Sequence, residues 1–65
     1  MMKNNIKKTI DDKNLKIVDV LEKTGLSKSY LYDVMNGNSV PSLVNARKIA
    51  EALGEELEDV FKNED

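Results

Sequence analysis

The 65-residue sequence contains no cysteine and no histidine. Without thiols the chain forms neither a disulfide framework nor a thiolate metal site, and this composition fits a reducing compartment. Without imidazole it also lacks the side chain best suited to general-base chemistry near neutral pH and a common metal ligand. We therefore expect no metal and no other cofactor.

Long apolar runs are missing as well. No segment approaches the roughly 20 apolar residues of a membrane-spanning helix. The opening residues 1–13, MMKNNIKKTIDDK, have no apolar stretch of the kind found in a signal peptide. No segment pairs a strong apolar helix face with a lysine-rich one, as a membrane-surface helix does. We therefore expect a cytoplasmic protein with no membrane partner.

Catalytic patterns are absent too. The sequence has no glycine-rich phosphate loop, and the acidic residues at 55–59 do not have the spacing of a calcium loop. Those carboxylates fit the solvated start of a helix, where the helix dipole favours negative charge. We expect no enzyme and find no sign of a small-molecule effector.

The charge is unevenly distributed along the chain. The formal net charge is −2, but residues 1–50 hold nine Lys/Arg against five Asp/Glu, whereas residues 51–65 hold one against seven. A basic body with an acidic end suggests one side that faces a polyanion. The alternative interpretation is a chance scatter of solvated charges.

Apolar residues recur at helical spacing throughout, so we predict a single domain over residues 1–65 that folds as an all-α, compact five-helix bundle. The expected helices cover about 5–13, 17–24, 28–36, 43–53 and 55–61, and residues 62–65 are expected to fray. Ser27 and Ser42 are expected to cap helix starts, and Asn14, Gly25, Gly37 and Gly54 to end helices. The expected core includes Ile6, Ile10, Val20, Leu21, Leu31, Val34, Met35, Leu43, Ala46, Ile49, Ala50, Leu53, Leu57, Val60 and Phe61.

The segment 15–41, LKIVDVLEKTGLSKSYLYDVMNGNSVP, predicts two short amphipathic helices joined by a tight turn at Gly25. Packing through Leu26, Leu31 and Val34 would leave the opposite face of the second helix free. This is the construction of a helix-turn-helix, in which the second helix enters the major groove of DNA.

Two blocks of sequence, TGLSKSYLYDVMNG and PSLVNARKIAEALG with LEDVF after it, resemble the Cro and phage-repressor (XRE-type) helix-turn-helix family. The spacing between the blocks fits as well, and the resemblance covers nearly the whole chain. It implies a lambda-repressor-like domain that binds specific double-stranded DNA. The implied function is a transcriptional regulator, a small bacterial or phage repressor acting as a homodimer.

By this resemblance, the base-contacting residues are Lys28, Ser29, Tyr32 and Asp33. A lysine can donate to guanine O6 and N7, a serine to several base edges, and a tyrosine can contact a thymine methyl. Asp33 could accept from cytosine N4 but would be repelled by phosphates. The alternative interpretation of this face is an ordinary solvated helix surface.

Contacts to the DNA backbone are expected from helix N-termini and the polar residues near them. The candidates are Lys16, Ile17 (through its backbone), Ser27, Asn36, Asn38, Ser39, Ser42 and Asn45.

The chain departs from the family pattern at several positions. Ile17 stands where the family usually has a phosphate-binding Gln, and Leu21 stands where it usually has Ala. Ile10 and Met35 together replace an Arg–Glu ion pair, a joint loss that can be neutral or stabilising, and we expect these two side chains to touch. The loop 38–40 has no basic residue, so we expect weak non-specific DNA binding with a shallow salt dependence.

Two further questions stay open from the sequence. Val60 and Phe61 could form a dimer surface or be buried in the monomer. The chain could also be a protein-binding module on the same fold, such as an antitoxin, an anti-repressor or an accessory subunit. Asp33, the uncharged loop and the acidic end favour this alternative.

Overall fold

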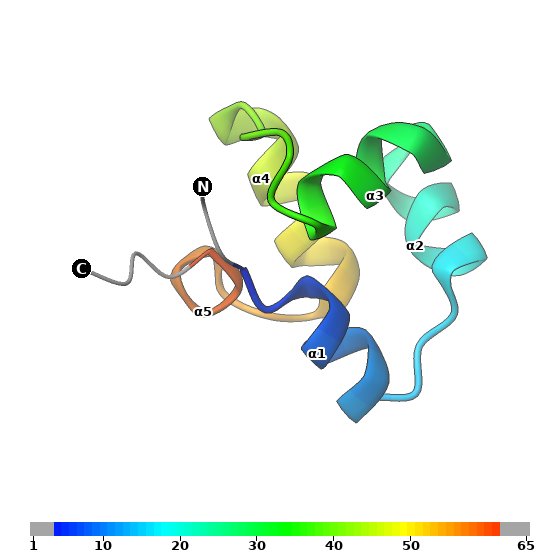
Figure 1. The fold of residues 1–65 in the computed structure, drawn as a ribbon. Helices are drawn as coiled ribbons and strands as arrows, with labels where there is room; N and C mark the ends of the chain where they lie inside the picture. Colours follow the sequence, from blue (N-terminus) through cyan, green and yellow to red (C-terminus); the bar gives the residue numbers. More distant parts are fainter. Residues whose placement is uncertain (1–3, 62–65) are drawn as a thin grey trace.

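The computed structural model describes residues 4–61, and within this range the secondary structure is entirely helical (Figure 1). The helices are α1 (Ile6–Asp12), α2 (Ile17–Thr24), α3 (Lys28–Met35), α4 (Leu43–Leu53) and α5 (Leu57–Val60). The expected all-α, five-helix architecture is confirmed. The expected fraying of residues 62–65 lies outside the described residues.

Helix α4 is the centre of the packing and contacts α1, α2 and α5. Its buried side chains, Ala46, Ile49, Ala50 and Leu53, follow the spacing of one helix face. They meet a core formed by Ile6, Ile10, Val20, Leu31, Val34 and Val60 from the other helices. Because every helix contributes to one apolar cluster, the position of α3 is fixed by the whole molecule.

The turn between α2 and α3 is built as the sequence predicts. Gly25 adopts the left-handed conformation (φ 71°), which glycine reaches at low cost, and its amide closes α2 on the Leu21 carbonyl. Two residues later, the Ser27 hydroxyl accepts a 3.1 Å hydrogen bond from the Tyr30 amide and caps α3. The tight connection places α3 directly after α2, as a helix-turn-helix requires.

Helices α2 and α4 have the predicted bounds, whereas the ends of α1, α3 and α5 differ from the prediction by one or two residues. Helix α1 lacks the expected Asn5 and Lys13, which are its flanking cap residues, and α3 ends at Met35 with Asn36 as its cap. Helix α5 is a single turn, Leu57–Val60, rather than 55–61. Glu55 and Glu56 precede the helix instead. The Glu55 backbone amide bonds back to the Ala50 carbonyl, and Glu56 is the N-cap residue of α5.

Most of the predicted core is buried, but Leu21, Met35, Leu57 and Phe61 are only half-buried, and one position is wrong. Leu43 was expected inside but is 59% exposed, as is its neighbour Val44 at 63%. Leu43 has the phase of the buried face of α4, three residues before Ala46. The buried face of α4 nevertheless begins only at Ala46, so phase alone does not bury Leu43.

Side-chain amides at the start of the chain hold α5 and α3 together. The Asn5 backbone N–H donates to the Val60 carbonyl at 2.8 Å, and its side-chain Nδ2 donates to the Asp59 carbonyl at 2.9 Å. The Asn4 side chain donates to the Val34 carbonyl at 2.7 Å. The carbonyls of Asp59 and Val60 at the end of α5 thereby gain partners. The Val34 carbonyl at the end of α3 accepts from both the Asn4 side chain and the Gly37 backbone amide.

Candidate nucleic-acid interface

Helix α3 separates a buried face from an exposed one. Leu31 and Val34 are 0% and 1% exposed and fix one side of the helix in the core. The other side is open to solvent and carries Lys28, Ser29, Tyr32, Asp33 and Asn36. The structure therefore brings the four predicted base-contacting residues and Asn36 together on one accessible face.

Within residues 4–61, the charged groups of this face form no ion pairs. The ion pairs of residues 4–61 are Lys8–Asp12 and Lys13–Glu55, both 3.1 Å long. Lys28 and Asp33 form no such pair within the described range, so their charges remain available to a ligand. A lysine donates and a carboxylate accepts, which allows the two residues to prefer different base edges in a major groove.

The two serines that cap helices can still reach a phosphate. Ser42 Oγ accepts from the Asn45 amide at 3.2 Å, and Ser27 Oγ accepts from the Tyr30 amide. Each hydroxyl uses only its oxygen lone pair in the cap, so its O–H remains free to donate. Both serines are exposed. Capping and phosphate binding are therefore compatible at these positions.

Tyr30 is a polar residue of this surface that the sequence reasoning missed. Its hydroxyl accepts a 3.2 Å hydrogen bond from Asn45 Nδ2 and so joins the first turn of α3 to the first turn of α4. Asn45 is half-buried, and its side-chain amide is partly used within the protein. One signal in the sequence could have pointed to it. Tyr30 lies in the first turn of the helix capped by Ser27, and a buried tyrosine hydroxyl usually finds a hydrogen-bond partner.

At the start of α2, the predicted contacts are Lys16 and Ile17. Lys16 is exposed and precedes the helix without a side-chain cap, whereas the Ile17 side chain is half-buried against the core. An isoleucine side chain makes no bond to a phosphate, so only backbone amides of this turn can do so. A helix start without a side-chain cap leaves such amides for an external anion.

The loop after α3 presents side chains rather than amides. The backbone amides of Asn38 and Ser39 both donate to the Asp33 carbonyl, at 2.8 and 3.2 Å. The side chain of Asn38 is exposed and Ser39 is half-buried. Any phosphate contact from this loop would therefore come from the amide and hydroxyl groups of these two side chains.

Ile10 and Met35 border the same hollow. Ile10 is 6% exposed, Met35 packs on the same core, and both line a cavity of about 220 Å³ between α1, α2 and α3. Ile17 and Tyr32 line the same cavity. Lys7, Asp11 and Asn36 also line this hollow. The Ile10 and Met35 side chains therefore border one space, and direct contact between them stays a prediction.

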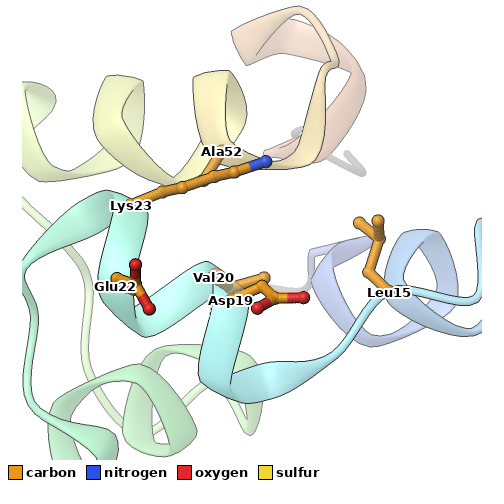
Figure 2. Close-up of a pocket in the computed structure, with 6 residues that line it drawn as sticks. All are labelled: Leu15, Asp19, Val20, Glu22, Lys23 and Ala52. Atoms are coloured by element: carbon orange, nitrogen blue, oxygen red, sulfur yellow. The ribbon is translucent and has the colours of Figure 1, made fainter.

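Two other hollows lie elsewhere on the surface. Figure 2 shows one of about 190 Å³ between α2 and α4, where Lys23 extends along Ala52 and the Asp19 and Glu22 carboxylates point in other directions. A wider hollow of about 580 Å³ borders Arg47 and glutamates of α4 and α5. Among residues 4–61, no three His, Cys, Asp or Glu side chains are arranged to hold a metal ion. In the same range, no helix is long and apolar enough to span a membrane.

Comparison with known families agrees with this geometry. A family model described as helix-turn-helix matches residues 6–60, which include all five helices. No curated protein is significantly similar to the chain.

Proposed function

Because the chain belongs to the Cro and phage-repressor (XRE-type) helix-turn-helix family, we propose that it is a sequence-specific, double-stranded-DNA-binding transcriptional regulator. The observation that carries the proposal is the division of α3 into a face fixed by Leu31 and Val34 and an exposed polar face. A single α-helix fills the major groove, where each base pair presents a distinct pattern of donors and acceptors.

In this proposal, Lys28, Ser29, Tyr32 and Asp33 read bases. The phosphate contacts come from the starts of α2 and α4 and from the residues near them, which set the orientation of α3 without reading sequence. They are Lys16, Ile17 (backbone), Ser27, Asn36, Asn38, Ser39, Ser42 and Asn45.

We further propose that the protein acts as a repressor and as a homodimer. One copy of α3 contacts only a few base pairs, and two copies on one face of a duplex place their recognition helices about 34 Å apart. Repression follows where the bound site overlaps a promoter. No catalytic step is part of this proposal, since the helix-turn-helix family binds DNA.

Selection from a random duplex library by the purified protein, at low and moderate salt, tests the proposal. We expect an inverted repeat whose half-sites lie about one helical turn apart. Recovery of no enriched motif at either salt concentration would reject a DNA-binding role for the free protein.

A second candidate function is a protein-binding module on the same fold, such as an antitoxin, an anti-repressor or an accessory subunit. Asp33 on the exposed face of α3 and the uncharged loop 38–40 favour it, because both weaken attraction to phosphates. The same selection distinguishes the two functions, since this module would enrich no DNA motif.

A further inference from the structure

A hydrogen bond between two side chains connects the first turns of α3 and α4. Tyr30 Oη accepts from Asn45 Nδ2 at 3.2 Å, across 15 residues of sequence. Among residues 4–61, it is the only side-chain hydrogen bond between these two helices. Helix α4 packs chiefly on α1, α2 and α5 rather than on α3. The bond therefore gives the two helix starts a direct polar link.

Both partners of this bond are held in place by their own helices. Each is the third residue after a capping serine. The Tyr30 amide donates to Ser27 Oγ at 3.1 Å, and the Asn45 amide donates to Ser42 Oγ at 3.2 Å. Tyr30 also packs against the apolar core, and both residues are half-buried. Because a tyrosine ring is rigid and carries its hydroxyl at the tip, the packed ring gives that hydroxyl a defined position beside Asn45.

The two linked helices have different tasks in the proposed complex with DNA. The exposed face of α3 contacts bases, whereas the start of α4 contributes the proposed phosphate contacts Ser42 and Asn45. Phosphate contacts fix the orientation in which a reading helix meets the base edges. Both sets of contacts can form together only if the start of α4 lies at the right distance from α3. The Tyr30–Asn45 bond spans this distance.

We propose that Tyr30 is a positioning residue for DNA binding, which holds the Asn45 side chain so that its amide meets a phosphate while α3 reads the bases. Asn45 Nδ2 carries two hydrogens, and the bond to Tyr30 uses one of them. The second hydrogen can donate to a phosphate oxygen. Without the Tyr30 hydroxyl, the Asn45 side chain has to be ordered when DNA binds, which lowers affinity. This inference rests on the proposed DNA-binding function and adds to it a residue that acts through Asn45.

Tyr30→Phe tests this role directly, because it keeps the ring and removes only the hydroxyl. Titration of the selected operator duplex with the folded variant should give an affinity about 3–10-fold below that of the wild type, as expected for one lost neutral hydrogen bond. The base preference at each operator position should stay unchanged. The slope of log K against log salt should also stay unchanged, because the substitution alters no charge.

A double-mutant cycle separates positioning from direct contact. Asn45→Ala removes the proposed phosphate donor and should also lower operator affinity. Because Tyr30 acts through Asn45, adding Tyr30→Phe to Asn45→Ala should change that affinity by less than about twofold. If Tyr30→Phe keeps its full effect in the Asn45→Ala background, the inference is overturned, since the Tyr30 hydroxyl would then contact DNA itself.

Asn5→Ala is the matched control. It also removes one side-chain hydrogen bond between distant segments, the 2.9 Å bond to the Asp59 carbonyl, and Asn5 is not among the proposed DNA contacts. Urea denaturation should show lower stability for both variants, whereas the operator affinity of Asn5→Ala should stay within about twofold of the wild type. An equal loss of affinity in the two variants would give Tyr30 a purely structural role and overturn the inference.

Failure of the proposed function is recognised separately, because the wild type would then bind no duplex and select no motif. That result would overturn the positioning role together with the DNA-binding function that it serves. Wild-type binding to the operator combined with undiminished affinity of Tyr30→Phe would overturn the positioning role alone.

Discussion

At the residue scale, the Lys13 side chain links residues that are far apart in the sequence. Its Nζ lies 2.9 Å from the Leu53 carbonyl, 3.3 Å from the Gly54 carbonyl and 3.1 Å from the Glu55 carboxylate. A cation at the C-terminal end of α4 binds carbonyls that have no partner in the helix and complements the helix dipole. Lys13 thereby ties the end of α1 to the end of α4.

Lys13→Met retains most of the aliphatic chain and removes the charge. We expect it to lower the free energy of unfolding by about 1 kcal/mol, a value reduced by the partial exposure of the group. Urea denaturation measures the change. Lys8→Met is the control, because the Lys8–Asp12 pair is 74% and 63% exposed and should contribute under about 0.5 kcal/mol. Equal effects of the two substitutions would refute the capping role.

Lys28 offers a residue-scale test of base reading. Lys28→Met removes the donor at the leading end of the exposed face of α3 and leaves the buried face unchanged. We expect the base preference at one operator position to relax, with a loss of roughly 1–3 kcal/mol of discrimination there. Selected-site sequencing of the variant measures it. A uniform loss across all positions would instead assign Lys28 to a phosphate, and Lys23→Met on α2 should change neither.

The residues that the sequence did not reveal are those whose partners are distant along the chain. Lys13 bonds to residues 53–55, Asn4 to Val34, and Asn5 to Asp59 and Val60. Local spacing contains no information about such contacts, because they exist only once α4 and α5 fold back on α1. Caps such as Ser27 were predictable, since both partners lie within one turn.

At the element scale, the bounds of α2 and α4 follow closely from the sequence because each helix is punctuated chemically. Left-handed glycines end both helices, at Gly25 and Gly54, and a serine begins α4. Helix α5 was predicted too long because it has no such signal: its cap position is Glu56, which makes no side-chain cap bond. The exposed face of α3 was predictable from the helical spacing of its apolar residues. The Tyr30–Asn45 hydrogen bond was not, because it depends on where α4 lies.

Ser42 allows the two roles of a helix start to be separated. Ser42→Ala removes the acceptor for the Asn45 amide and should lower the free energy of unfolding by about 1 kcal/mol. Ser42→Asp retains an acceptor, so stability should stay near that of the wild type while the added negative charge weakens DNA binding several-fold. Thermal unfolding and duplex titration provide the two values. Wild-type affinity in Ser42→Asp would remove Ser42 from the phosphate contacts.

At the scale of the whole molecule, the charge is divided between an acidic end and a basic remainder, and the basic part is sparse where DNA is proposed to bind. Of the proposed contact residues, only Lys16 and Lys28 are cationic, and Asp33 opposes them. The other proposed phosphate contacts are neutral donors, namely serines, asparagines and backbone amides. Such donors fix orientation with little release of counterions, so affinity depends on base contacts more than on charge.

The salt dependence of binding tests this balance for the molecule as a whole. Each neutralised phosphate contributes a slope of about −0.9 in log K against log salt, so we expect roughly −2 to −4 per subunit. Asn38→Lys adds one cation to the loop after α3 and should steepen the slope by about 0.9, with higher non-specific affinity. A wild-type slope that implies six or more phosphates per subunit would contradict the prediction. It would require basic side chains outside the proposed contacts, such as Lys7 or Arg47, to lie against the duplex, and with them a different placement of the molecule on DNA.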